Sequence, residues 1–228
     1  MARRLPFQGF VRVISGRIED MIKRQRYSRV MTSTSGDMCQ MRVLGVVGSP
    51  RKNGNTETLV DEVLRGAKEA GATVEKIFLN DLDIKPCQST CDEHCKAHGN
   101  CKIADDMSNL YDKLYGSDAI VLGTPVYWWG PSAQMKAFID RWYASSHPAF
   151  VKRFEGKKLT LVAPFEDSDI STADPLVGMI KKSAAYLKMD FLARLLVTAG
   201  EKGVVARNIK AMNEAYATGA LLNNPDIY

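Results

Sequence analysis

Short runs of β-branched and other apolar residues alternate with helix-length amphipathic stretches from Met41 onward. This alternation predicts a parallel sheet with helices on both faces. The predicted strands are residues 42–48, 73–78, 119–123, 158–163 and 193–198. Apolar residues three or four positions apart predict the buried faces of five helices. These faces consist of Leu59, Val60, Val63, Leu64 and Ala67; Met107, Leu110, Tyr111 and Leu114; Met135, Phe138, Ile139 and Trp142; Leu176, Val177, Ile180, Ala184 and Leu187; and Ala211, Met212, Ala215 and Tyr216.

The second predicted strand is the most polar of the five, since Glu75 and Lys76 interrupt it. Such polar positions suit the edge of a sheet, which favours the strand order 2-1-3-4-5 of a doubly wound α/β fold. In that order the topology switches direction between strands 1 and 3. The loops that follow Gly48 and Gly123 should therefore face each other across a ligand-binding crevice.

Charge is unevenly placed along the chain. Eight of the 31 Lys and Arg residues, but only three of the 26 Asp and Glu residues, lie in the first 40 positions. The rest of the chain has as many basic as acidic residues, so we expect no nucleic-acid partner.

No apolar run approaches the ~20 residues that cross a membrane, and we expect a cytoplasmic protein. Residues 1–40 are predicted to be a basic tail, disordered or ahead of the true start, with an organelle transit peptide as the alternative. Residues 41–228 are predicted to form the folded domain.

The loop after the first strand reads GSPRKNGNT at residues 48–56 and leads into a helix. It can offer one phosphate its backbone N–H groups, a helix amino terminus and polar side chains. The spacing is neither a Walker A motif nor Gly-x-Gly-x-x-Gly, which favours a terminal monophosphate. The alternative is a plain turn with Thr56 as a helix cap. The candidate phosphate ligands are Ser49, Arg51, Asn53, Gly54, Asn55 and Thr56.

The loop after the third strand places three aromatic residues between two prolines. Such faces are costly to leave in water, and a flat tricyclic ring would use them. The alternative is an oligomer interface that buries Trp128 and Trp129. The candidate ring contacts are Pro125, Val126, Tyr127, Trp128, Trp129 and Gly130. On the helix that follows, Lys136, Asp140 and Arg141 are expected to form a solvated face with a salt bridge.

Four ordered motifs resemble the NADPH-dependent FMN reductase and iron–sulfur flavoprotein family: residues 48–56, the cysteines followed by DDM at 105–107, TPVYW at 124–128, and QMKAFIDR at 134–141. The resemblance implies a flavodoxin-like fold in which residues 49–56 bind the FMN phosphate and residues 125–130 lie along the isoalloxazine ring. It also implies that Glu166, Asp167 and Ser168 lie near the flavin, and that the protein is a homodimer or homotetramer.

Four of the five cysteines, Cys87, Cys91, Cys95 and Cys101, lie in a predicted insertion at 84–104 that follows the second strand, beside the predicted crevice. Four thiolates are the number that a [4Fe–4S] cluster needs. Family members with a cluster resemble Cys-x2-Cys-x2-Cys-x5-Cys, whereas both short spacers here contain three residues. The alternatives are a zinc site, with His94 and His98 as spare ligands, and ordinary thiols.

Together these features predict an FMN-dependent oxidoreductase whose flavin, and no catalytic side chain, carries the chemistry. Its donor would be NAD(P)H or a ferredoxin-like protein, and its acceptor a small molecule or another protein. One alternative is a flavodoxin-like electron carrier without its own substrate. Another is a non-catalytic module that binds flavin or zinc.

Overall fold

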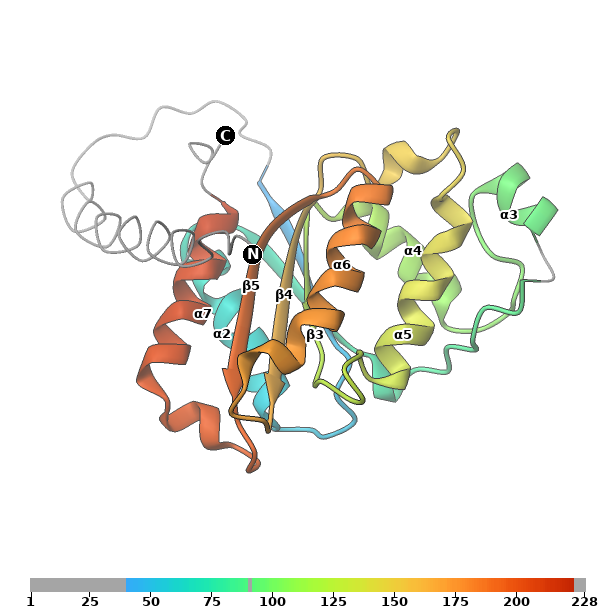
Figure 1. The fold of residues 1–228 in the computed structure, drawn as a ribbon. Helices are drawn as coiled ribbons and strands as arrows, with labels where there is room; N and C mark the ends of the chain where they lie inside the picture. Colours follow the sequence, from blue (N-terminus) through green and yellow to red (C-terminus); the bar gives the residue numbers. More distant parts are fainter. Residues whose placement is uncertain (1–39, 90–91, 224–228) are drawn as a thin grey trace, which may run out of the picture. The chain divides into compact units, whose positions relative to one another are not determined.

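Five parallel strands form one sheet in the order β2-β1-β3-β4-β5, as predicted (Figure 1). The computed structural model describes residues 40–89 and 92–223. The strands are β1 (Arg42–Val47), β2 (Thr73–Phe78), β3 (Ala119–Gly123), β4 (Lys158–Phe165) and β5 (Asp190–Thr198). The last two are longer than predicted, because they stay paired with each other from Lys158 and Asp190 to Phe165 and Thr198.

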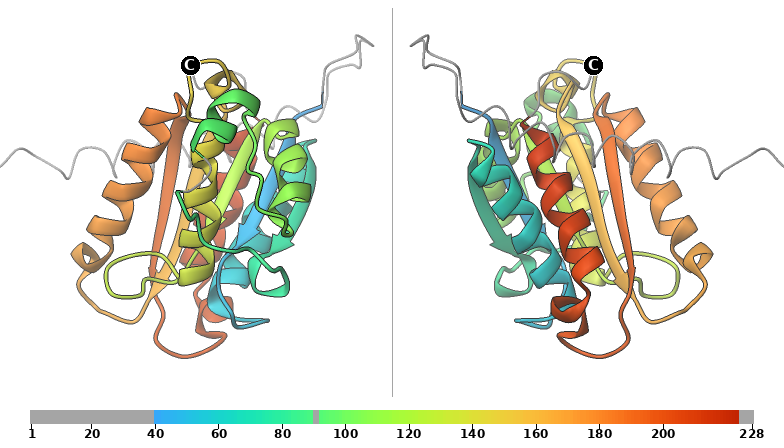
Figure 2. Two further views of the ribbon diagram at one scale, coloured as in Figure 1. Left: turned by 90° about the vertical axis from the view of Figure 1, so that its right-hand side faces the viewer. Right: turned by 90° about the vertical axis from the view of Figure 1, so that its left-hand side faces the viewer.

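Helices cover both faces of the sheet (Figures 1 and 2). Helices α2 (Asn55–Glu69) and α7 (Ile209–Leu222) lie on one face, and α4 (Met107–Gly116), α5 (Ala133–Asp140) and α6 (Asp174–Tyr186) lie on the other. A short helix, α3 (Asp92–His98), lies outside the layer of α4 and α5. The 3₁₀ turns are η1 (Leu79–Asp81), η2 (Arg141–Ser145), η3 (Val151–Arg153), η4 (Ile170–Ala173) and η5 (Val204–Arg207).

Burial follows the predicted pattern. Strands β3 and β4 are buried along their whole length, whereas the first four residues of the edge strand β2 are exposed or half-buried. The apolar faces predicted for the helices are buried as well, apart from Met212 and Tyr216, which are half-buried. The sequence periodicity therefore identified both hydrophobic layers.

Two glycines bring α2 and α7 into close contact. A Cβ atom on Gly219 would lie 1.8 Å from the carbonyl oxygen of Val63, and one on Gly66 would lie 2.0 Å from that of Tyr216. No side chain fits at such distances, so the two helix backbones touch directly. This contact holds α2 in place at the end of β1.

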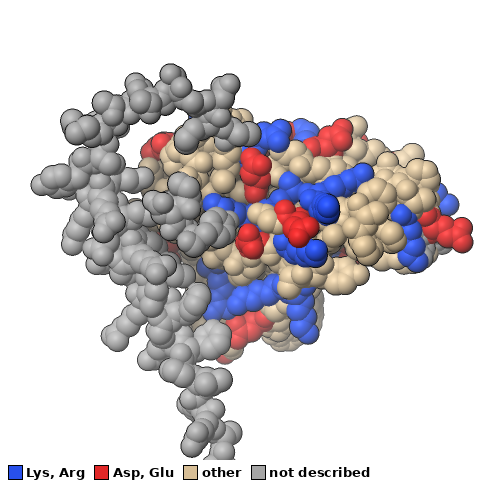
Figure 3. All heavy atoms as spheres, turned by 90° about the horizontal axis from the view of Figure 1, so that it is seen from above, with Lys and Arg blue, Asp and Glu red and all other residues tan. Residues whose placement is uncertain are grey.

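The described residues, 40–89 and 92–223, belong to one compact unit, and residues 1–39 of the predicted tail lie outside them. In the part of the chain that the structure describes, every helix is too short or too polar to cross a membrane. Figure 3 looks onto the edge formed by the amino ends of the strands, where Lys and Arg are interspersed with Asp and Glu. This view agrees with the balanced charge of the sequence after position 40.

Candidate functional site

A cleft of about 230 Å³ opens at the carboxyl ends of the strands. The loops after β1, β3, β4 and β5 contribute to it, as expected for a doubly wound sheet. Its lining consists of Ser49, Arg51, Gly54, Asn55, Thr56, Pro125, Val126, Tyr127, Pro164, Phe165, Glu166, Ala199, Gly200 and Lys202. The structure thus brings nine of the predicted FMN contacts together, and the other six lie outside this lining.

The amino terminus of α2 faces this cleft without a side-chain cap. Its N-cap residue is Gly54, whose neighbour Asn53 has a positive φ of 53°. The Asn53 N–H donates to Glu57 Oε2 at 2.6 Å, so one backbone group of the turn is satisfied. The N–H groups of the first helical turn have no intrahelical acceptor, which makes them suitable donors to an anion.

A network of hydrogen bonds joins the loops after β1 and β3. The N–H of Gly48 donates to Gly123 O at 2.7 Å, and Ser132 Oγ donates to Gly48 O at 2.5 Å. Ser132 also caps α5, because its Oγ accepts from Met135 N at 3.2 Å. Gly48 leaves no room for a side chain, since a Cβ would lie 2.8 Å from that of Met135. These contacts hold the two candidate loops at a constant separation.

Asn55 contacts the loop after β5 through its side chain. Its Nδ2 donates to Ala199 O at 3.3 Å and to Glu201 O at 2.7 Å, and its Oδ1 accepts from Val205 N at 3.4 Å. The side-chain amide is therefore engaged elsewhere, and the backbone N–H is what Asn55 can offer to a phosphate. Sequence reasoning missed this loop, although Gly200 follows a predicted strand at the same edge of the sheet.

Trp128 and Trp129 form the tip of a tight turn beside the cleft. Tyr127 and Gly130 exchange two backbone hydrogen bonds of 2.9 and 3.0 Å. Both tryptophans have positive φ, 49° and 60°, a conformation that disfavours bulky side chains. They are 90% and 54% exposed, and only Tyr127 of the three aromatic residues lines the cleft.

Only one of the three contacts predicted in the loop after β4 lies at the cleft. Glu166 lines the cleft and approaches Gly200, where a Cβ would lie 3.3 Å from Glu166 Cγ. Asp167 is turned into its own loop, where its carboxylate accepts from Asp169 N and Thr172 Oγ1 at 2.9 and 2.8 Å. Ser168 is exposed. Of the three predicted residues, Glu166 alone reaches the cleft lining.

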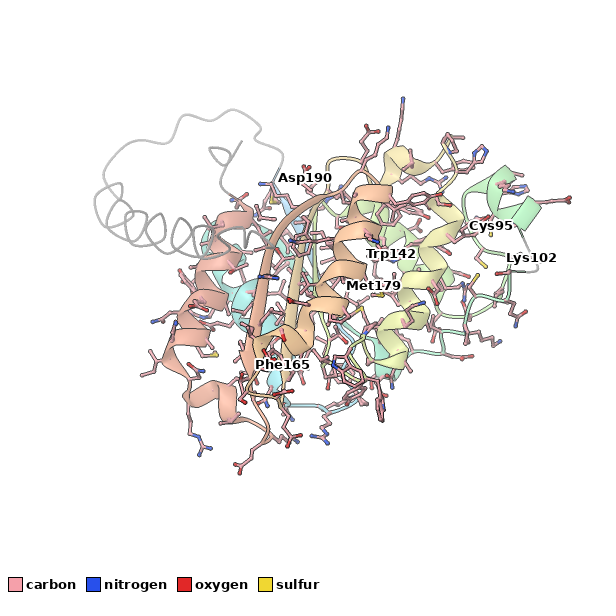
Figure 4. All side chains as sticks on the ribbon, in the orientation of Figure 1. Cys95, Lys102, Trp142, Phe165, Met179 and Asp190 are labelled. Atoms are coloured by element: carbon pink, nitrogen blue, oxygen red, sulfur yellow. The ribbon has the colours of Figure 1, made fainter. Side chains whose placement is uncertain are left out.

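The cysteine-rich segment extends away from the cleft. None of its described cysteines lines the cleft, and Figure 4 shows Phe165 at the carboxyl end of β4 but Cys95 out on α3. The expected position beside the crevice is therefore wrong for Cys95. Cys91 lies outside the described residues, and among the residues that the structure describes no disulfide links Cys87, Cys95 and Cys101. Within the described ranges, no three His, Cys, Asp or Glu residues are grouped so as to hold a metal ion.

Arg141 is buried, contrary to the expected solvated face. Its side chain is 1% exposed and pairs with that of Asp105, which is 0% exposed. Lys136 and Asp140 do form the exposed salt bridge, at 2.6 Å. Burial alone would raise the pKa of Asp105, but hydrogen bonds from Arg141 and from the N–H of Lys85 hold it below its ordinary value. The helical spacing could not reveal this, because Asp105 lies on another element.

Comparison with known proteins identifies the family. The sequence pattern of NADPH-dependent FMN reductases matches residues 41–170, more than half of the chain. The chain belongs to the NADPH-dependent FMN reductase family. The part matched by this reductase pattern includes the loops after β1 and β3, while the loop after β5 lies beyond it.

Proteins similar to this chain are named as flavoproteins or oxidoreductases. An iron–sulfur flavoprotein of Methanocaldococcus jannaschii is 45% identical over 101 residues, which are 44% of this chain and 51% of that protein. A putative NAD(P)H-dependent FMN-containing oxidoreductase of Bacillus subtilis is 24% identical over 77% of this chain and 94% of its own. The structure of an NAD(P)H:quinone oxidoreductase from Methanothermobacter marburgensis superposes with a TM-score of 0.67 at 16% identity, covering 83% of this chain and 100% of its own. The chain spans about half the length of the iron–sulfur flavoproteins that it matches.

Proposed function

We propose that this chain is an FMN-dependent oxidoreductase that moves electrons from a reduced nicotinamide to a small-molecule or protein acceptor. One observation carries the proposal: the uncapped amino terminus of α2 and the loop of Pro125, Val126 and Tyr127 line the same cleft. The first can bind a phosphate and the second can lie along a flat ring. Membership of the reductase family supports FMN as the molecule that has both parts.

The side chains around the cleft would bind and orient the cofactor. Arg51 would donate to the phosphate together with the N–H groups at the start of α2, while Ser49 and Thr56 would add hydroxyl groups. Pro125, Val126 and Tyr127 would exclude water from one side of the ring. When bound, FMN supplies the hydride and electron chemistry, and the protein contributes binding, orientation and electrostatics.

The predicted contacts that do not line the cleft have supporting roles in this proposal. Trp128 and Trp129 adjoin Tyr127, and their exposed rings could cover a ring seated beside them or pack against a second copy of the chain. Packing of these rings against a second copy would form a homodimer or homotetramer. Asn53, Gly130, Asp167 and Ser168 would shape the loops around the cofactor. A cytoplasmic location stays a prediction of the sequence.

The choice of electron donor rests on the family description and on the Bacillus subtilis relative, both of which name a nicotinamide. A ferredoxin-like donor is the alternative. Anaerobic addition of NADPH to the FMN-loaded protein should bleach the flavin absorbance near ~450 nm. Unchanged absorbance with NADPH and NADH, but reduction by a ferredoxin, would instead indicate an electron carrier without its own substrate.

The phosphate site can be tested separately with a pair of neighbouring residues. Arg51 lines the cleft, whereas Lys52 pairs with Asp81 at 2.8 Å and lies outside the lining. Arg51→Ala should weaken FMN binding about 10- to 100-fold, as expected for loss of a charge-assisted hydrogen bond, and Lys52→Ala should leave it nearly unchanged. Equal affinities for FMN in fluorescence titrations of the two variants would refute the assignment.

We propose further that Cys87, Cys91, Cys95 and Cys101 hold an iron–sulfur cluster. The relatives named iron–sulfur flavoproteins support this, as do two buried donors, Arg141 Nε and Trp142 Nε1, that find no acceptor among the described residues. Buried donors of this kind often mark a group that is not included in a structure. Iron and zinc analysis of protein purified without oxygen tests the proposal. Zinc without iron would select a zinc site, and neither metal would leave ordinary thiols.

A further inference from the structure

The loop after β5 is fixed to the first residue of α2 at three points. Asn55 Nδ2 donates to Ala199 O at 3.3 Å and to Glu201 O at 2.7 Å, and Asn55 Oδ1 accepts from Val205 N at 3.4 Å. Glu201 O belongs to the peptide unit that joins Glu201 to Lys202. The backbone of Lys202 therefore lies next to the residue at which α2 begins. Figure 1 shows this loop and the loop after β1 at the same edge of the sheet.

Lys202 lines the cleft, and so does Arg51. Both residues are exposed, and among the described residues neither side chain has an ion-pair partner. Lys52, which lies outside the cleft lining, instead pairs with Asp81 at 2.8 Å. An exposed lysine without a partner is ordinary by itself. Two such cations that line one cleft together with the uncapped amino terminus of α2 favour an anionic ligand.

The third charged residue of the lining is Glu166. It approaches the same loop from the end of β4, since a Cβ atom on Gly200 would lie 3.3 Å from Glu166 Cγ. Within the part of the chain that the structure describes, its carboxylate forms no ion pair with Lys202. The flexible four-carbon stem of Lys202 leaves its ammonium group able to turn toward a ligand in the cleft.

The charge of a phosphate explains why a second cation is useful here. A phosphate monoester carries about 1.5–2 negative charges at neutral pH. The amino terminus of α2 supplies the equivalent of roughly half a positive charge, and Arg51 supplies one more. These two sources match the phosphate only at the lower end of that range. The charge of Lys202 would complete the neutralisation.

We propose that Lys202 binds the phosphate of FMN, and that Asn55 is a positioning residue that holds Lys202 at this site. The inference rests on the proposed FMN-dependent function and extends it, because the loop after β5 lies beyond the part of the chain that the reductase pattern matches. The phosphate then binds to two loops that are far apart in the sequence. The side chain of Asn55 acts on the phosphate only through Lys202.

Paired titrations with FMN and riboflavin test the role of Lys202. Riboflavin has the same ring and ribityl chain but lacks the phosphate, so loss of a phosphate ligand should affect FMN alone. In flavin-free Lys202→Gln, FMN binding followed by quenching of flavin fluorescence should weaken about 2- to 10-fold, and riboflavin binding should change less than about 1.5-fold. Lys210→Gln is the control, since Lys210 pairs with Glu214 outside the cleft lining, and both affinities should stay unchanged.

Salt provides a second readout for Lys202. The loss of FMN affinity in Lys202→Gln should shrink as the salt concentration rises from about 0.01 M to about 1 M, because the Debye length falls from about 30 Å to about 3 Å. A loss that is equal at both concentrations would mean that the side chain acts through packing, and would overturn the phosphate role.

A double-mutant cycle tests the positioning role of Asn55. Asn55→Ala keeps the backbone N–H at the start of α2 but removes the contacts to the loop after β5. It should weaken FMN binding about as much as Lys202→Gln does, leave riboflavin binding nearly unchanged, and have little further effect when combined with Lys202→Gln. If Asn55→Ala fails to fold, Asn55→Ser carries the same expectations, because serine is favourable at the start of a helix.

Four results would overturn the inference. If wild type and Lys202→Gln bind FMN equally well, the phosphate role is refuted while the proposed function stands, and a raised KM for NADPH in the variant would assign Lys202 to a phosphate of the electron donor. Equal losses for FMN and riboflavin would assign Lys202 to Glu166 or to the ring. Fully additive losses in the cycle would refute the positioning role of Asn55. If wild type binds neither flavin, the proposed function fails, and this inference fails with it.

Discussion

The contact between α2 and α7 predicts that Gly→Ala has opposite effects on stability at two helix positions, Gly219 and Gly178. Gly219 lies in α7 against α2, whereas a Cβ atom added to Gly178 in α6 would meet nothing within 4 Å. In an open helix position, Gly→Ala stabilises by about 0.5–1 kcal/mol. At Gly219 the new Cβ would lie 1.8 Å from Val63 O and 2.8 Å from Ala67 N. The two helices would have to separate by roughly 1 Å or more, since real contacts are longer than this.

The cost at Gly219 can be estimated from this separation. A gap of about 0.5–1 Å forfeits a quarter to a half of the dispersion attraction between facing atoms, and overpacking a filled interface typically costs about 1–3 kcal/mol. Allowing for the gain in helix propensity, we expect Gly219→Ala to destabilise the protein by roughly 2 kcal/mol. For a domain of this size that lowers Tm by about 4–8 °C, while Gly178→Ala should raise it by about 1–4 °C.

Thermal unfolding followed by circular dichroism would measure both variants. Because α2 carries the candidate phosphate site at its amino terminus, Gly219→Ala should also reduce FMN retention on gel filtration, and Gly178→Ala should not. Shifts of the same sign in the two variants would refute the steric argument. So would a Gly219→Ala protein as stable as wild type, since it would mean that the helices separate at little cost.

Three more outcomes are expected, one at the buried pair of Asp105 and Arg141 and two around the cleft. The pKa of Asp105 is lowered in the folded protein, so its charged form stabilises the fold at neutral pH, and this contribution is lost as the pH falls through that pKa. Asp105→Asn should therefore lower the free energy of unfolding in urea at neutral pH but much less in strong acid. A difference between the two proteins that does not change with pH would contradict this. Replacing Trp128 and Trp129 by Asn and Gly should relieve about 1–2 kcal/mol of backbone strain and raise Tm, whereas a lower Tm would show that the tryptophans pack. Asn55→Ala should speed amide exchange in residues 199–205, because each lost hydrogen bond costs about 0.5–1.5 kcal/mol. Unchanged exchange would show that the Asn55 side chain does not hold the loop after β5 in place.

Much of the fold could be predicted because the signals are local. Alternation of strands and helices, the apolar faces and the polar edge strand are all read within short windows, and each reflects which side of an element meets the core. The position of the cleft followed as well, because parallel strands bring their carboxyl ends to one edge. This is why Arg51 and Tyr127 were expected to face one crevice, and both line the same cleft.

Residues whose partners are distant in the chain could not be assigned in this way. Asn55 looks like a phosphate ligand in its motif, but its amide bonds to Ala199, 144 positions later. Arg141 looks like a solvated helix residue, but its partner Asp105 lies 36 positions earlier on another element. Hydrogen bonds and steric contacts act over a few ångströms in space, and only the folded chain decides which distant residues come that close. Local patterns were enough to predict the two helix layers and the edge of the sheet where the cleft opens. Only the folded chain showed which polar groups at that edge already have partners, because those partners are distant in the sequence.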